Sequence, residues 1–292
     1  MSSAPTRSAR SVVAATALAP VAWGTTYFVT TELLPPGRPL LAGVLRALPA
    51  GLALAAATRA RPVGAWWGRA VVLGTLNIGA FFALLFVAAY RLPGGVAATL
   101  GAVQPLIAAG LGAVLLRERV SPRVVVAGAL GIAGVALLVL RAGATLDSVG
   151  VLAGVAGATA MASGVVLTKR WGRPVPLLAF TSWQLVAGGL VLLPVALLVE
   201  GPPPSLTGTN LAGYLWLGSA GTAVAYALWF RGIERLPVSR VSILGLLSPV
   251  VATAVGWLVL EQGLTAAQVL GAGVVLGALW LGQRTPVVER VG

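Results

Sequence analysis

Isolated polar side chains interrupt several long apolar stretches of the sequence, and these side chains could bind a solute. Asn77 carries an amide, and Gln104 and Ser248 each stand directly before a proline, Pro105 and Pro249. An unpaired polar group in an apolar environment is costly, so each should face a cavity or a polar partner. Asn77 suits either solute contact or hydrogen bonding between helices. Gln104 and Ser248 suit either solute contact or pairing with carbonyls that the prolines leave free.

Aromatic side chains accompany these polar groups at helical spacing. Trp23, Thr26 and Tyr27 fall on one helical face, and Thr222, Tyr226 and Trp229 fall on another. Aromatic walls with an occasional hydroxyl suit amphipathic organic solutes, although ordinary packing is the alternative for the first face. The candidate substrate-binding residues are Trp23, Thr26, Tyr27, Asn77, Phe82, Gln104, Ser163, Tyr226, Trp229 and Ser248.

The sequence offers no set of residues for catalysis or for holding a metal. It contains no cysteine and no histidine, which excludes disulfides, thiol nucleophiles and imidazole bases. The seven acidic residues are scattered and form no cluster. Gly271, Gly273 and Gly277 do not have the dinucleotide-binding spacing. We therefore expect no catalytic residue, no metal and no cofactor, and a membrane-embedded enzyme is the least favoured alternative.

Composition indicates a protein of the lipid bilayer. The chain is 58% hydrophobic and 9% charged, whereas soluble domains are about a quarter charged. The first apolar run is long enough to span and similar runs recur, so we interpret it as a helix and not as a cleaved signal peptide. Ten spanning helices are predicted: 12–30, 40–57, 70–89, 95–116, 122–140, 149–168, 177–199, 211–230, 238–260 and 265–283.

The basic residues predict the orientation of these helices. Sixteen of the twenty fall in segments on one side, three fall on the other, and Arg46 lies within the second helix. The positive-inside rule then places both termini in the cytoplasm. Arg46 is about 9 Å from the outer end of its helix, shallow enough to extend outward to the interface, with solute or helix-end contact as the alternative. Scattered basic residues of this kind do not indicate nucleic-acid binding.

The two halves of the chain are similar. Arg91-Leu92-Pro93 matches Arg235-Leu236-Pro237 at an offset of 144 residues, and Pro105 matches Pro249 at the same offset. Five helices per copy force the second copy into the opposite orientation, and the arginines change sides between equivalent loops accordingly. The predicted domains are residues 1–143 and 144–292. The paired prolines predict a hinge near the middle of the fourth and ninth helices.

The order of these motifs resembles the EamA-type drug/metabolite transporters over almost the whole chain. The resemblance rests on Pro20-Val21-Ala22-Trp23-Gly24, the paired Arg-Leu-Pro turns, the paired prolines, and Glu118 and Glu261 after their helices. It implies a carrier of small metabolites, with a central cavity lined by the first, third, fourth, sixth, eighth and ninth helices. It also implies that the fifth and tenth helices pack at the periphery. Their glycines Gly128, Gly131, Gly134, Gly273 and Gly277 suit close helix contacts.

The expected function is secondary transport across a bacterial inner membrane. No Asp, Glu, Lys or His is placed at mid-membrane, so alternating access without a carboxylate proton relay is predicted. The substrates would be amino acids or drug-like amphipathic solutes, and export is the expected direction. The chain is expected to act as a monomer in the lipid bilayer. A lipid flippase or a structural membrane subunit without a substrate path is the alternative.

Overall fold

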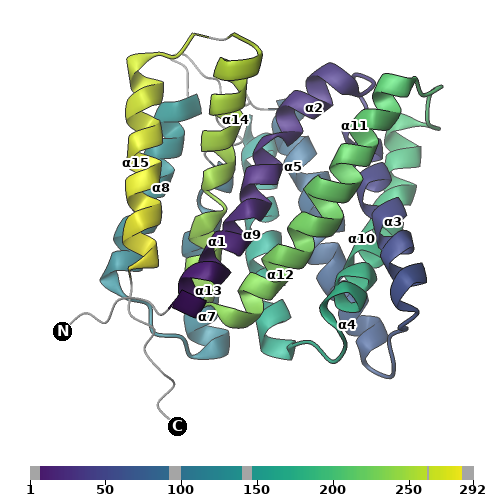
Figure 1. Cartoon of the computed structure of the whole chain (residues 1–292), viewed down its shortest axis with the longest axis horizontal. Coiled ribbons are helices and arrows are strands. Elements are labelled where there is room, and N and C mark those ends of the chain that lie inside the picture. The colour runs from purple at the N-terminus through teal and green to yellow at the C-terminus, as the bar shows by residue number, and fades with distance from the viewer. Residues whose placement is uncertain (1–6, 92–99, 140–146, 262, 285–292) are drawn as a thin grey trace.

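A computed structural model of the chain describes residues 7–91, 100–139, 147–261 and 263–284, and every regular element among them is helical. Figure 1 shows these helices packed as one bundle. The elements are α1 (Arg7–Gly24), α2 (Thr26–Leu33), α3 (Pro39–Thr58), α4 (Trp66–Gly74), η1 (Thr75–Gly79), α5 (Ala80–Arg91), α7 (Gln104–Leu116), α8 (Pro122–Val139), α9 (Ser148–Trp171), α10 (Leu177–Glu200), α11 (Gly208–Gly218), η2 (Ser219–Val224), α12 (Ala225–Arg235), α13 (Val238–Leu244), α14 (Leu247–Val259) and α15 (Ala266–Gln283).

The all-helical membrane architecture predicted from composition is confirmed. Nine stretches of the described residues are long and apolar enough to cross a membrane. The remaining predicted span begins at residues 95–99, which lie outside the described part, and continues as the shorter apolar helix α7. Large apolar side chains such as Val114 and Leu198 are exposed on the surface of the bundle, where lipid chains would cover them.

Two helix pairs form the most extensive contacts and lie at opposite ends of the bundle's long axis (Figure 1). In the pair α3 and α10, Gly51 lies against Val186 and Gly189 lies against Leu48. The same spacing of 138 residues separates Gly51 from Gly189 and Leu48 from Val186. The contact therefore repeats itself with the roles of the two helices exchanged, as a two-fold relation between the halves requires.

The second pair joins α8 to α15 at the periphery, as predicted for the fifth and tenth helices. A Cβ added at Gly271 would lie 2.7 Å from the carbonyl oxygen of Gly134, so the two backbones touch. The close contact predicted for Gly134 is confirmed. For Gly273 and Gly277 the prediction is wrong, because both face open space, and Gly271 makes the contact in their place.

The other two predicted glycines of α8 also permit close packing, but against different segments. Gly128 lies against Leu106 of α7, and Gly131 lies against Leu246, which follows α13. The glycines of α8 thus let the helix approach both its peripheral partner and the centre of the bundle.

The fourth and ninth predicted helices are broken, where the sequence predicted continuous helices with a central proline kink. After α13 ends at Leu244, the amide of Gly245 bonds the carbonyl of Ser242, and the amide of Ser248 bonds that of Gly245. These tight turns precede Pro249, which lies in the first turn of α14. Pro105 likewise lies in the first turn of α7. A proline fits there because the first turn of a helix has no amide partner to lose.

The third and eighth spans each contain a π-helical turn that the sequence did not predict. Thr75–Gly79 forms η1 and Ser219–Val224 forms η2, and their first residues are 144 positions apart. A π-turn holds one extra residue, which displaces backbone carbonyls from the regular hydrogen-bond pattern. The repeat therefore extends to a local distortion of the backbone.

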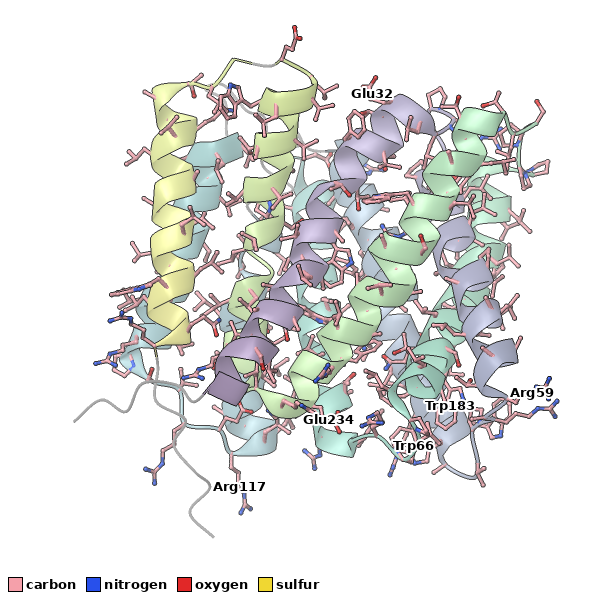
Figure 2. The ribbon with its side chains drawn as sticks, in the orientation of Figure 1. Glu32, Arg59, Trp66, Arg117, Trp183 and Glu234 are labelled. Carbon is pink, nitrogen blue, oxygen red and sulfur yellow. The ribbon has the colours of Figure 1, made fainter. Side chains whose placement is uncertain are left out.

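The two ends of the bundle differ in charge. Figure 2 shows Arg59 and Arg117 at one end, here called the arginine-rich end, and Glu32 at the opposite end. At the arginine-rich end, Glu118 accepts a hydrogen bond from the amide of Val238 at the start of α13 and lies 3.5 Å from Lys169. The carboxylate of Glu118 therefore caps the start of one helix and pairs with a lysine of another.

Replacement of Gly271 by alanine should destabilise the contact between α8 and α15. The new Cβ would press on backbone atoms, which cannot rotate away, and such overpacking costs about 1–3 kcal/mol. We expect a lower melting temperature for the purified protein in detergent, measured by circular dichroism. Gly273→Ala is the matched control on the same helix, because its Cβ meets nothing within 4 Å. Equal melting temperatures for the two variants would contradict the packing described here.

Candidate functional site

Aromatic side chains from two distant segments meet at the centre of the bundle. The ring of Trp23, in the last turn of α1, lies 5.3 Å from that of Tyr226 and 5.1 Å from that of Trp229, both on α12. Tyr226 and Trp229 are almost completely buried. The predicted aromatic faces of the first and eighth helices are therefore brought together. Their tilted rings form one apolar wall.

A charged side chain closes this aromatic cluster. The Nε atom of Arg46 donates to the hydroxyl of Thr222 at 2.9 Å, and its Nη2 atom donates to the carbonyl of Gly221 at 2.8 Å. The same carbonyl accepts a bond from the indole Nε1 of Trp23 at 3.1 Å. The π-turn η2 makes this possible, because it leaves the Gly221 carbonyl available to side chains of other helices.

The predicted outward extension of Arg46 is wrong. Its side chain is buried and turns into the bundle, with the guanidinium carbon 5.2 Å from the centre of the Phe82 ring. A freed carbonyl, a hydroxyl and an aromatic face together replace part of the hydration that the cation loses. Arg46 is therefore part of the central site.

A second polar cluster lies nearer the arginine-rich end. The amide nitrogen of Asn77, in η1, donates to Gln184 at 2.8 Å and to Thr168 at 3.2 Å. The hydroxyl of Tyr226 donates to the carbonyl of Asn77 at 3.3 Å. Asn77 is fully buried, so the structure shows the hydrogen bonding between helices that was one of its two predicted roles.

The two clusters are related by the repeat. Asn77 and Gly221 are 144 residues apart, and Arg46 and Gln184 are 138 apart, the spacing that relates α3 to α10. In each cluster a side chain from one half reaches a π-turn of the other half. The chemistry differs, because one cluster contains a cation and the other only amides and hydroxyls.

Four predicted residues carry buried polar atoms without a hydrogen-bond partner among the described residues: Thr26 Oγ1, Asn77 Oδ1, Gln104 Nε2 and Trp229 Nε1. Gln104 and Trp229 both approach Gly245, the residue at the break in the ninth span. Such unpaired groups are costly in an apolar interior, and ligands or water commonly satisfy them. Near Gly245, the unpaired atoms of Gln104 and Trp229 mark a place where a bound molecule could make polar contacts.

The remaining predicted residues are less informative. Ser163 and Ser248 are half-buried on α9 and α14. The side chain of Tyr27 lies outside the described part of the structure. A substrate contact for any of the ten residues stays a prediction.

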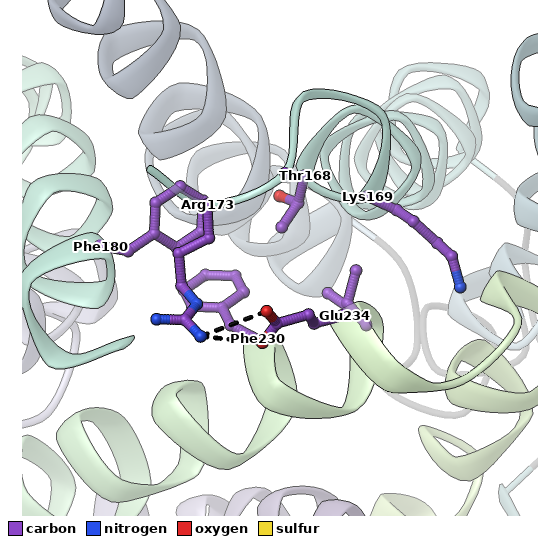
Figure 3. Close-up of a pocket in the computed structure, with 8 residues that line it drawn as sticks. Thr168, Lys169, Arg173, Phe180, Phe230 and Glu234 are labelled. Carbon is purple, nitrogen blue, oxygen red and sulfur yellow. Dashed lines mark hydrogen bonds and ion pairs between the residues drawn. The ribbon is translucent and has the colours of Figure 1, made fainter. Parts of the chain in front are cut away.

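A cavity of about 80 Å³ lies at the arginine-rich end, next to the second cluster (Figure 3). An ion pair between Arg173 and Glu234, 3.2 Å apart, spans it, and Lys169 extends away from that pair. Its lining residues are Thr168, Lys169, Gly172, Arg173, Phe180, Phe230, Ile233 and Glu234, none of which was predicted as a contact. Two of them adjoin the centre, because Thr168 bonds Asn77 and the Phe230 ring lies 5.7 Å from that of Tyr226.

The candidate residues predicted from the sequence include neither Thr168 nor Gln184, and Arg46 was expected to extend toward the interface. Arg46 and Gln184 are separated by 138 residues, and so are Gly51 and Gly189. This shared spacing could have identified Arg46 and Gln184 as equivalent positions of the two halves. Thr168 gave no comparable signal, since a threonine near a helix end is common in membrane helices. Among the described residues, no three His, Cys, Asp or Glu side chains gather where they could hold a metal ion. The arrangement is suited to binding a solute between two polar closures.

Known proteins are similar to this chain in sequence and in structure over most of its length. The chain is 49% identical over 274 residues to Protein PecM of Dickeya dadantii, covering 93% of this chain and 92% of PecM. It is 27% identical over 218 residues to a probable amino-acid metabolite efflux pump of Salmonella typhimurium, covering 71% of this chain and 73% of the pump. A crystal structure at 22% identity superposes with a TM-score of 0.80, covering 93% of this chain and 96% of the other, which shows a shared fold.

The family model for the EamA-like transporter family matches the chain twice, at residues 10–140 and 148–282. These two matches cover nearly all of the described helices and correspond to the two halves that the internal similarity indicated. The chain therefore belongs to the EamA-like transporter family.

Proposed function

We propose that the protein is a secondary transporter that exports small amphipathic metabolites, such as amino acids or drug-like solutes, across a bacterial inner membrane. Family membership and the relative named as an amino-acid metabolite efflux pump support this direction and substrate class. The distribution of basic residues supports a cytoplasmic arginine-rich end, with both termini on that side. We further propose that the chain works as a monomer in the bilayer.

The observation that carries the mechanism is the pair of related polar clusters. Arg46 of the first half bonds η2 of the second half, and Gln184 of the second half bonds Asn77 in η1 of the first half. The first cluster lies toward the outer end of the bundle, and the second lies toward the cytoplasmic end. Each cluster acts as a gate between the halves, and alternating access opens one gate at a time.

The breaks before the paired prolines are the proposed hinges. Pro105 and Pro249 start the rigid halves α7 and α14, and the preceding tight turns can absorb a change in backbone angles. Gln104 and Gly245 approach each other where these segments meet. Movement at the breaks would therefore change the region between the gates. The halves that move are the predicted domains, 1–143 and 144–292.

The position of the acidic residues supports transport without a proton relay. Each carboxylate of the described residues lies at or beside a helix end: Glu32, Glu118, Asp147, Glu200, Glu234 and Glu261. A proton relay through the membrane requires ionisable groups at mid-depth. We therefore propose uniport or exchange.

Weakening each gate should expose the centre from one side only. Ser248→Cys provides a half-buried reporter at the start of α14, beside Gly24 of α1, in this cysteine-free chain. In that background Gln184→Leu should raise labelling by a membrane-impermeant maleimide in inside-out vesicles, and Thr222→Val should raise it in right-side-out vesicles. The loss of one hydrogen bond, about 1 kcal/mol, corresponds to a rise of about fivefold.

Thr159→Val is the control for the labelling experiment. Its exposed hydroxyl bonds only the carbonyl of Val155 in the same helix, so labelling should not change from either side. Equal labelling from both sides in the two gate variants, or no increase in either, would reject the gates.

Transport should not depend on a proton gradient. In proteoliposomes, exchange of radiolabelled phenylalanine should proceed at equal pH, and an imposed pH gradient should not drive accumulation. Phenylalanine suits the test because it stays zwitterionic near neutral pH. Accumulation that follows the gradient and is lost in Glu118→Gln would refute the uncoupled mechanism.

A further inference from the structure

Among the described residues, no acidic side chain balances the charge of Arg46. No carboxylate of the described residues lies within 4.0 Å of its guanidinium. The residue sits seven positions into α3, about 10 Å along the helix axis, in a segment that spans the membrane. A buried cation without a counter-ion is expensive in such a place and is retained where it has a function.

The guanidinium also has unused donors. It carries five N–H groups, and the bonds to Thr222 and Gly221 use one on Nε and one on Nη2. The Nη1 atom donates to none of the described residues. An arginine with free N–H groups binds planar anions such as carboxylates, often through two parallel bonds.

The surroundings of Arg46 indicate the rest of the ligand. Trp23 shares the Gly221 carbonyl with Arg46 and stacks near Tyr226 and Trp229. Trp229 Nε1 is buried and has no partner among the described residues, so the aromatic wall offers a further donor. A cationic group at the edge of an aromatic wall matches a solute with an anionic group on an aromatic or apolar body.

We propose that Arg46 is the anion-binding residue of the transport site and that the substrate is an organic anion, or a zwitterion presenting its carboxylate, with an apolar body. This inference rests on the proposed transport function and narrows its substrate class. Binding of the anion supplies a counter-ion that the described residues do not provide.

A pair of probes that differ only in charge tests the proposal. The full-length protein in phosphatidylcholine nanodiscs is titrated by calorimetry with 3-phenylpropionate and with its neutral amide, 3-phenylpropionamide, and empty nanodiscs give the background. Phosphatidylcholine contributes no net anionic headgroup, so any preference for the anion comes from the solute. We expect the anion to bind about tenfold more tightly or better, as a charge-assisted pair requires. Equal affinities in the wild-type protein would overturn the proposal without reference to any variant.

Variants then assign the preference to Arg46. Arg46→Gln should bring the ratio of the two affinities close to one, and Arg46→Lys should keep part of it, because the charge remains without the fork of donors. Arg38→Gln is the matched control, since Arg38 lies outside the site and bonds the carbonyl of Pro202. A preference that survives in Arg46→Gln would refute the role of this residue.

Transport of the same probes separates this inference from the proposed function. Exchange of both probes at equal rates in phosphatidylcholine vesicles, with equal affinities, would overturn the anion site and leave a transporter. Tight binding of the anion with no exchange of either probe would overturn the transport function and support the anion site.

Discussion

The carbonyl group of Gly221 is the point on which the central arrangement depends. In the interior of a membrane protein every backbone polar group needs a partner within the protein, because lipid offers none. The π-turn η2 removes this carbonyl from its regular helical bond, and Arg46 and Trp23 both donate to it. Three segments distant in sequence are thereby joined at one atom. The position of the buried cation and the contact between the two aromatic faces both follow from it.

The other half of the chain also contains a π-turn whose carbonyl accepts a hydrogen bond from a side chain, but the side chains differ. At η1 the carbonyl of Asn77 accepts a bond from Tyr226, and the Asn77 amide reaches Gln184 and Thr168. Two halves with a common architecture therefore form polar clusters of different chemistry. Only one of the two clusters contains a charged side chain. In a scaffold of two similar halves, such a difference is what can distinguish one class of solute from another.

The sequence predicted the larger features of the fold because these depend on local properties. Helix length and charge distribution follow from runs of apolar residues and from the loops between them, and nine of the predicted spans are found in the described residues. The aromatic faces of Trp23 and of Tyr226 with Trp229 were also predictable, because helical spacing alone decides which residues share a face. A distortion of the fourth and ninth helices at Pro105 and Pro249 was predicted, but its form, a break and not a kink, was not. A proline disfavours a continuous helix without deciding between a kink and a break.

By itself, then, the sequence determined a membrane protein of two similar halves, the aromatic faces of its helices and the absence of cysteine and histidine chemistry. Only the tertiary structure decided which polar groups meet. Arg46 and Thr222 are 176 residues apart, and the local sequence around either residue does not indicate that it contacts the other. The two π-turns were equally hidden, because the local pattern of apolar residues does not show where a helix takes up one extra residue. Hydrophobicity and charge can be read from the local sequence, and they determine where helices form and how they are oriented. Hydrogen-bond partners in an apolar interior are instead determined by how the helices pack.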